Sequence, residues 1–410
     1  MAPRAVRSLG LRTRTGVGNA GDIRRLNLER VLAIAMDRHE PFTRAELIQA
    51  TGLSAPTVGS LASQLIRSGL VRDLGTSASR GGRRPTSMEF NTSHGFVAGI
   101  DLGPTRTRLA VADLRGARLA HRVVPTPVGL DPAALLTRLA EDVKELLAEA
   151  QIPRGRLVAV GAGAPGAVDR ERGVVTLASN LQGWSQVPMR EILRRALGAP
   201  VVVENDVNLA ILGEHWRGAA VGHSTCAFIS VGTGIGAGIL MDGELHRGHH
   251  SLAGEIGLMC MGPQFVGGEE KTQGSLESLA GLKALASRWP PGAGSDPERW
   301  VAELFDAAEV GDGQARRALD EVATLIGIAT ANLSVVLDPS LIVLGGAVVA
   351  KGKPFLHDVR RIVGRILLEP TEIVVSALGK EAPLWGSLLV ATNEAQELLR
   401  RRLRQAWATP

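Results

Sequence analysis

Two glycine-rich strand–turn–strand segments constrain the fold of this chain more than any other feature. In residues 229–258, four glycines are spaced two apart between β-branched runs: Gly232, Gly234, Gly236 and Gly238. Because these positions lack side chains, backbone N–H groups there can approach a phosphate closely. A similar strand–turn–strand plan begins at Phe96. The repetition predicts a duplicated α/β body with a ligand site in the cleft between its lobes.

The first 90 residues differ from the rest of the chain in charge. They hold 14 Lys and Arg against 7 Asp and Glu, whereas the remaining residues hold 32 against 34. A basic front on a near-neutral body indicates a polyanionic partner for the front alone. A solvated basic tail is the alternative. It accounts for residues 1–21, which we expect to form a disordered arm, but not for the patterned segment that follows.

Residues 22–90 have the pattern of a winged helix-turn-helix. Apolar residues at helical spacing predict three helices, capped in turn by Asp22, Thr43 and Ser54. The third helix is expected to carry short or hydrogen-bonding side chains on its outer face, which suits the floor of a DNA major groove. Strand-like residues 70–73 and 87–90 then flank an arginine-rich loop, as in a β-hairpin wing.

The candidate DNA contacts lie on these helices and on the loop of the wing. They are Thr43, Ser54, Thr57, Ser60, Gln64, Arg80, Arg83 and Arg84. A three-helix module for protein interaction is the alternative, but it does not explain why a basic wing follows the third helix at the right distance.

Composition limits the class of protein. At 410 residues the chain is long enough for two or three domains. It shows no apolar run of 18 residues and no signal-peptide pattern, so we expect a cytoplasmic protein that does not contact a membrane. Its two cysteines, Cys226 and Cys260, form no metal-binding or disulfide motif.

A second group of polar residues follows the strand-like run at 200–203. Glu204, Asn205 and Asp206 come directly after it, so their side chains emerge at the carboxyl end of a strand, where α/β proteins bind ligands. Asn205 and Asp206 together can donate to and accept from vicinal hydroxyls, and Asp206 is suited to act as a base on a sugar hydroxyl. A helix cap before Val207 is the alternative interpretation.

Several motifs together resemble one protein family. They are VGTGIGAGIL, AGEIG, ENDVNLAILGE, GAPGAVD, SNLQGW and LGGAVV, with GGRRP after the front helices. In these the chain resembles ROK-family transcriptional regulators, from a group of repressors and sugar kinases, over nearly all of residues 22–400. The resemblance implies an α/β fold in which a winged helix-turn-helix precedes a two-lobed actin/hexokinase-like (RNase H-like) body at 91–410. The smaller lobe would comprise about 91–204 plus the C-terminal helix, and the larger lobe about 205–380.

The resemblance also assigns roles to individual residues. Asp206 matches the catalytic base of the family's kinases. The sugar-binding positions match Asn180, Asn205, Asp206, Glu255 and Glu277. The ATP-phosphate loops match Asp101, Gly103, Thr105, Gly232, Thr233, Gly234 and Gly236.

The chain departs from the family's kinases at decisive positions. The family's sugar- and zinc-binding histidine is Leu258 here, and three zinc-binding cysteines fall on Gly268, Glu270 and Ser275. The usual glycine–threonine–lysine of the first phosphate loop is Pro104-Thr105-Arg106, and proline removes an N–H donor. We therefore expect no bound metal and no cofactor, and Asp206 to be the remnant of a catalytic base.

These observations favour a sugar-responsive DNA-binding regulator that is not an enzyme. We expect a repressor of carbohydrate uptake or catabolism genes, released from double-stranded operator DNA by a sugar or sugar phosphate. The resemblance implies a homodimer or homotetramer. One alternative is an ATP-dependent sugar kinase that also binds DNA, which Asp206 favours and Pro104 and Leu258 oppose. Another is a regulator that responds to a protein partner instead of a sugar.

Overall fold

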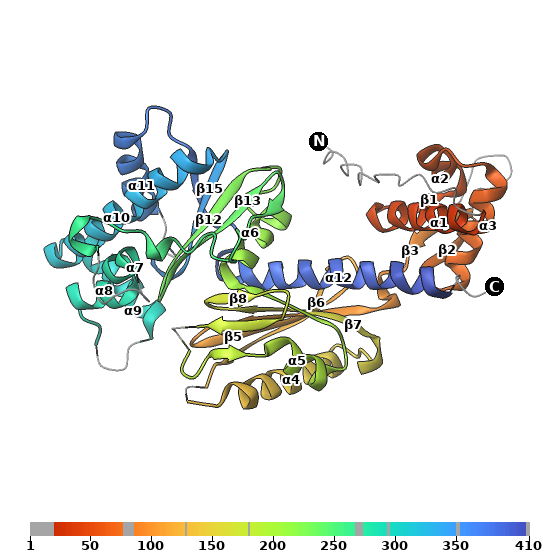
Figure 1. Ribbon diagram of the computed structural model, residues 1–410, viewed down its shortest axis with the longest axis horizontal. Helices are drawn as coiled ribbons and strands as arrows, with labels where there is room; N and C mark the ends of the chain where they lie inside the picture. The colour runs from red at the N-terminus through yellow and green to blue at the C-terminus, as the bar shows by residue number, and fades with distance from the viewer. Residues whose placement is uncertain are drawn as a thin grey trace.

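The computed structural model describes residues 20–76, 86–127, 129–178, 181–266, 274–292, 296–349 and 353–406. It has a small helical module at one end of the molecule and two lobes, each built on a five-stranded sheet (Figure 1). The expected fold class, an α/β body behind a winged helix-turn-helix, is confirmed.

The N-terminal module consists of three helices and a β-hairpin. The elements are α1 (Ala20–Asp37), β1 (Phe42–Thr43), α2 (Arg44–Thr51), α3 (Ala55–Arg67), β2 (Val71–Thr76) and β3 (Thr86–Phe90). Thr43 caps α2 in a capping box with Glu46, and Ser54 caps α3 by accepting from the N–H of Thr57. Asp22 lies in the first turn of α1, so this helix begins earlier than predicted. The tip of the wing, with Arg80, Arg83 and Arg84, falls outside the described residues.

The first lobe is built on a sheet with the strand order β11-β7-β4-β5-β6. Its strands are β4 (Phe96–Leu102), β5 (Arg106–Asp113), β6 (Arg118–Pro125), β7 (Leu157–Ala164) and β11 (Val201–Asn205). Helices α4 (Pro132–Glu149) and α5 (Met189–Leu197) cover one face, and α12 (Ala382–Ala406) covers the other (Figure 1). A small antiparallel sheet lies beside it, formed by β8 (Ala167–Asp169), β9 (Val174–Leu177) and β10 (Ser185–Val187).

The second lobe repeats this plan in the order β14-β13-β12-β15-β16. Its strands are β12 (Cys226–Val231), β13 (Ile235–Met241), β14 (Glu244–Leu245), β15 (Leu341–Gly345) and β16 (Glu372–Val375). Its helices are α6 (Asp206–Arg217) on one face and, on the other, α7 (Ser275–Ala280), α8 (Leu282–Arg288), α9 (Pro297–Glu309), α10 (Gly313–Leu337) and α11 (Lys353–Ile366). In both sheets the first strand pairs antiparallel with the second and parallel with the fourth. The duplication expected from the glycine-rich segments is therefore present.

The two lobes exchange a helix. Helix α6 follows the last strand of the first lobe but packs on the sheet of the second, and α12 follows the last strand of the second lobe but packs on the sheet of the first. The two helices also cross each other. A side chain at Gly213 would clash with the carbonyl of Ala382, and one at Gly386 would clash with the carbonyl of Leu209. The backbones thus touch at the junction of the lobes.

Helix α10 is the one helix among the described residues that is long and apolar enough to cross a membrane. Its inner face, including Val322 and Ile326, is buried in the core of the second lobe, and Gly327 lies against Ile362 of α11. This packing identifies it as a core helix of that lobe.

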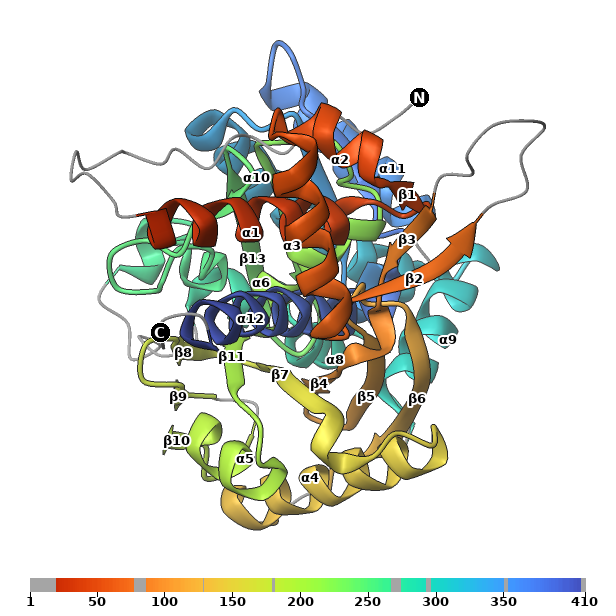
Figure 2. The ribbon, with the colours of Figure 1, turned by 90° about the vertical axis from the view of Figure 1, so that its right-hand side faces the viewer.

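The C-terminal half of α12 reaches the N-terminal module. Leu399 and Leu403 belong to the same buried hydrophobic cluster as Leu28 and Leu32 of α1. Figure 2, which faces the N-terminal module, shows α12 ending beside it. The module is therefore attached to the body by a continuous apolar core and not only by a linker.

We predict that Gly161→Ala destabilises the first lobe. The added methyl group would clash with the backbone carbonyl of Ser387 on α12, which cannot yield as a flexible side chain would. Overpacking of this kind costs about 1–3 kcal/mol in free energy of unfolding. Gly155→Ala is the control, because a methyl group there meets open space. Urea unfolding checks the prediction, and equal midpoints for the two variants would contradict the packing of α12 on β7.

Candidate functional site

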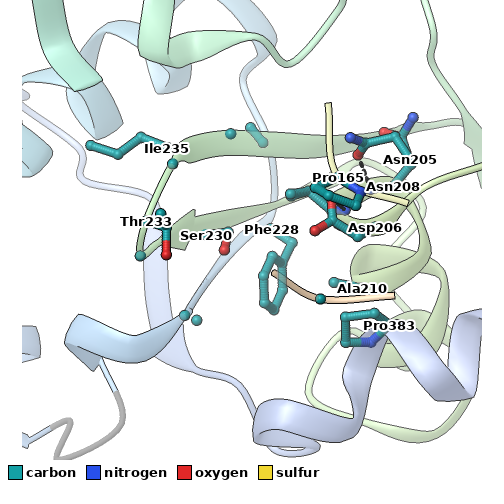
Figure 3. Close-up of a pocket in the computed structure, with 18 of the residues that line it drawn as sticks. Pro165, Asn205, Asp206, Asn208, Ala210, Phe228, Ser230, Thr233, Ile235 and Pro383 are labelled. Atoms are coloured by element: carbon teal, nitrogen blue, oxygen red, sulfur yellow. Dashed lines mark hydrogen bonds between the residues drawn. The ribbon is translucent and has the colours of Figure 1, made fainter. Parts of the chain in front are cut away.

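A cavity of about 480 Å³ lies between the two lobes, where both sheets end (Figure 3). It is lined by almost every residue that the sequence singled out for sugar or phosphate binding. These are Asp101, Gly103, Thr105, Asn205, Asp206, Gly232, Thr233, Gly234, Gly236, Glu255 and Glu277. Asn180 falls outside the described residues. Two sets of residues far apart in the chain thus face one cavity.

The start of α6 carries Asn205 and Asp206. The Oδ1 atom of Asn205 accepts from the N–H of Asn208 at 3.0 Å, and its Nδ2 donates to the carbonyl of Gly166 at 3.0 Å. Asn205 is therefore a helix cap, as the alternative interpretation proposed, while it also lines the cavity. Asp206 accepts from the N–H of Val207 and lies beside Asn205 in the wall of the cavity (Figure 3).

Burial raises the pKa of three acidic side chains in the cavity. Burial raises the pKa of Asp206 to about 7, and the charges of Asp101 and Glu255 add to this. Burial, followed by repulsion from Glu277, raises the pKa of Glu255. Burial also raises the pKa of Glu277, although its Oε2 accepts from the N–H of Ile235 at 2.9 Å. With a pKa of about 7, Asp206 is protonated in part near neutral pH, so it can donate to a hydroxyl as well as accept from one.

An arginine that the sequence analysis missed faces the first phosphate loop. Arg108 is the cross-strand partner of Asp101, and its Nη1 lies 3.5 Å from Asp101 Oδ2. Both side chains are largely buried. Burial raises the pKa of Asp101 to about 6, and the guanidinium of Arg108 opposes that rise. The β4–β5 hairpin was expected, so pairing its strands in register would have revealed Arg108.

A second ion pair crosses between the lobes at the edge of the cavity. Arg247, which follows β14, lies 2.7 Å from the carboxylate of Glu204 at the end of β11. Glu204 also accepts from Asn208 Nδ2 at 3.0 Å. The sequence analysis left Arg247 out and gave Glu204 no role of its own. Arg247 could hardly be predicted from the sequence, because it lies in a loop and only the fold brings that loop close to Glu204.

The two phosphate loops differ in what they offer. In the first, Gly103 donates to the carbonyl of Arg106 at 3.2 Å, and Pro104 has no N–H. Arg106 lies 3.4 Å from Asp296 on the opposite lobe. In the second, Gly232 donates to the carbonyl of Gly234 at 3.0 Å within the β12–β13 turn. The first loop therefore has one backbone N–H donor fewer than it would have with a glycine in place of Pro104.

The segment that carries the family's zinc ligands has other chemistry here. Leu258 is 48% exposed and does not line the cavity. The hydroxyl of Ser275 donates to the carbonyl of Met259 and accepts from the N–H of Met261, which closes the segment by hydrogen bonds. Gly268 and Glu270 fall outside the described residues. In the described part of the chain, no three His, Cys, Asp or Glu side chains are grouped so as to hold a metal ion.

The outer face of α3 differs from the expectation at one residue. Ser54 and Ser60 are exposed, and the hydroxyls of Ser54 and Thr57 lie 2.8 Å apart. The prediction that Gln64 faces outward is wrong, because it is only 5% exposed. It lies about 60° around the helix from Leu61, within the buried face. Its Oε1 has no hydrogen-bond partner among the described residues.

Arg24 of α1 extends this face and was not found from the sequence. Its Nη2 donates to the hydroxyl of Ser60 at 3.0 Å, and its side chain is exposed. The guanidinium therefore lies on the outer face of α3, where it has further N–H donors to offer. Nothing in the helical periodicity of α1 indicates this contact, because it depends on how α1 crosses α3.

Comparison with known proteins agrees with the fold. Residues 97–394 match the ROK family. The chain belongs to the ROK family. It is 32% identical over 358 residues to a putative xylose repressor from Caldicellulosiruptor sp. (strain Rt8B.4), an alignment that covers 85% of this chain and 89% of that protein. The resemblance seen in the sequence motifs is therefore confirmed.

Two solved ROK structures, a transcriptional regulator and a glucokinase, are similar to this chain. A ROK family transcriptional regulator, a homolog of the E. coli MLC protein, aligns with a TM-score of 0.74 and 22% identity over 92% of this chain and 98% of its own, which shows a shared fold. A ROK family glucokinase from Streptomyces griseus in complex with glucose and AMPPNP aligns with a TM-score of 0.60 and 30% identity over 73% of this chain and 100% of its own. The ROK body thus aligns with both kinds of protein.

We predict that Asp206→Asn stabilises the protein more at pH 8 than at pH 5. The folded-state pKa of about 7 lies above that of an unfolded aspartate, so the stabilising contribution of the protonated form is complete below about pH 4 and is lost as the pH rises toward 7. Asparagine avoids that loss, which we expect to amount to about 2–4 kcal/mol at pH 8. Thermal unfolding at the two pH values measures it. Asp242→Asn, in an exposed turn, is the control, and equal effects of both variants would contradict the raised pKa of Asp206 in the cavity.

Proposed function

We propose that this protein is a sugar-responsive transcriptional repressor in the cytoplasm. The observation that carries the proposal is the continuous apolar core that joins a winged helix-turn-helix to the first lobe, which forms one wall of a cleft lined by residues that match the family's sugar kinases. The similarity to a putative xylose repressor supports it, because that similarity covers 85% of the chain. We assign residues 22–90 to operator binding and residues 91–410 to effector binding.

The operator is double-stranded DNA read by a homodimer or homotetramer. The exposed residues Ser54, Ser60 and Arg24 on or beside α3 suit the major groove, where guanidinium and hydroxyl groups hydrogen-bond to base edges. The arginines of the wing, Arg83 and Arg84, supply phosphate or minor-groove contacts that weaken with salt. Two such modules related by a twofold axis read an inverted repeat.

The effector is a sugar held in the cleft by Asn180, Asn205, Asp206, Glu255 and Glu277. The arginines that line the cavity are each paired with a carboxylate: Arg106 with Asp296, Arg108 with Asp101 and Arg247 with Glu204. A phosphate group would have to compete with these carboxylates. The charge balance therefore favours an uncharged sugar over a sugar phosphate.

A sugar kinase that also binds DNA is the second candidate, since Asp206 is retained and a ROK glucokinase aligns with the body. The pair between Arg108 and Asp101 and the missing N–H of Pro104 oppose it, because phosphoryl transfer needs a preorganised cradle for the phosphates and their metal ion.

We expect negligible phosphorylation of D-glucose and D-xylose with ATP and Mg²⁺. A coupled assay of ADP release measures it. Turnover of about 1–100 per second, the usual range for kinases, would establish the second candidate if Asp206→Asn abolishes it.

We predict that Asp206→Ala gives a repressor that the effector cannot release. The variant keeps the operator-binding face, because Asp206 lies in the cleft, but loses a hydroxyl ligand. The measurement is a gel mobility shift on DNA upstream of the protein's own gene, with D-xylose, D-glucose and their phosphates. If the same sugar concentration releases both the wild type and Asp206→Ala from the DNA, the assignment of Asp206 to the effector site is wrong. Asp242→Asn is the control and should respond as the wild type does.

A further inference from the structure

We propose that the turn between β5 and β6, residues 113–117, transmits the effector signal from the cleft to the winged helix-turn-helix through Arg115. The proposal rests on the repressor function proposed above. It makes Arg115 a positioning residue, because its guanidinium contacts the end of α1 and its side chain does not line the cavity.

Helix α6 connects the cleft to this turn. It begins beside the cavity at Asn205 and Asp206 and ends at Arg217. Its 12 residues make a helix about 18 Å long. At that end, Arg217 Nη2 donates to the carbonyl of Gly116 at 3.1 Å. A sugar that moves the start of α6 therefore moves a group bonded to the turn.

Two tryptophan rings pack against Arg217 and restrict its movement at this contact. The guanidinium of Arg217 lies 4.1 Å from the ring centre of Trp216 and 4.7 Å from that of Trp385 on α12. Gly116 has a φ of +71°, and a side chain there would clash with the indole of Trp216. The turn is thus pressed against the end of α6, at the level where α6 and α12 meet.

The turn itself is held rigid by Asp113. Its main-chain carbonyl accepts from the N–H of Gly116 at 2.9 Å. Its Oδ1 accepts from the N–H groups of Arg115 and Ala117, each at 2.9 Å. With the turn closed by these three bonds, a displacement of Gly116 carries the backbone of Arg115 with it.

Arg115 contacts the end of α1 directly. Its Nη2 donates to the main-chain carbonyl of Arg38 and, at 3.4 Å, to that of Ala35. The last carbonyls of a helix lack partners within the helix, so a guanidinium there stabilises its C-terminus. The same guanidinium lies 5.5 Å from the ring centre of Phe90 at the end of β3. Arg115 thus holds both the first helix and the wing hairpin of the DNA-binding module.

The neighbouring Leu114 fixes the turn to the rest of the junction. Its N–H donates to the carbonyl of Thr92 in the connection to the body, and its carbonyl accepts from Gln396 of α12, both at 3.1 Å. The turn therefore lies where α1, α6, α12 and the connection all meet. A route through this point requires no contact between the sugar and the DNA-binding module.

The first experiment measures the coupling between sugar and operator in the full-length protein. Operator affinity is determined with and without D-xylose or D-glucose, and sugar affinity with and without operator. We expect reciprocal factors of about 5- to 150-fold in the wild type. Arg115→Ala should bind each partner alone within about threefold of the wild type, with a coupling factor near one. Arg115→Lys, which keeps a cationic donor, should restore part of the coupling.

The matched control is Arg404→Ala. Arg404 is also an arginine that contacts α1, through Glu29 at 3.3 Å, but it comes from α12 and not from the turn. It should keep the coupling of the wild type. Full coupling in Arg115→Ala, or an equal loss in Arg404→Ala, would overturn the assignment to the turn. Thermal unfolding confirms that the variants are folded.

A second experiment needs no sugar. Because coupling is reciprocal, operator DNA alone should change amide hydrogen exchange in residues 206–217 of the wild type and not in Arg115→Ala. Unchanged exchange there in a wild type that binds operator would overturn this route while leaving the repressor function intact. A wild type that binds neither operator nor sugar would instead overturn the repressor function itself, and the route with it.

Discussion

The crossing of α6 and α12 is the contact on which the rest of the structure depends. Glycines at Gly213 and Gly386 let the two backbones touch, and each helix covers the sheet of the opposite lobe. This exchange fixes the two sheets with their carboxyl ends toward one cavity. Because of this exchange, each helix also contacts a different part of the molecule at each of its two ends. Helix α6 joins the cleft to the β5–β6 turn, and α12 runs from the lobe junction to the DNA-binding module.

The charges of the cleft support the proposed regulatory role of this kinase-like body. Asp101, which matches a phosphate-loop residue in the family's kinases, faces Arg108 from the paired strand. A guanidinium beside that carboxylate reduces the negative charge available to a metal–nucleotide complex. Asp206, Glu255 and Glu277 remain in the cavity and keep raised pKa values because they are buried together. The cleft thus keeps groups suited to hydroxyls, while its phosphate half is occupied by the protein's own ion pairs.

Much of the fold could be predicted because it depends on local patterns. The spacing of apolar residues indicated α3, the glycine-rich turns indicated the hairpins, and the repeat of the hairpin plan indicated a duplicated body. Part of the lining of the cavity followed for the same reason, since Asn205 and Asp206 come at the end of a strand, and the resemblance to the ROK family added Asp101, Glu255 and Glu277. The prediction for Gln64 failed because helical spacing alone does not show how wide the buried face of α3 is.

The sequence by itself determined the family, the order of the elements and the residues at the ends of the strands, because these are written in short stretches of chain. Only the tertiary structure decided which distant groups meet. The pairs Arg247 with Glu204 and Arg24 with Ser60, and the contact of Arg115 with α1, each join separate elements. Such contacts depend on how whole helices and sheets pack, and packing is set by the summed fit of many side chains and not by any local pattern.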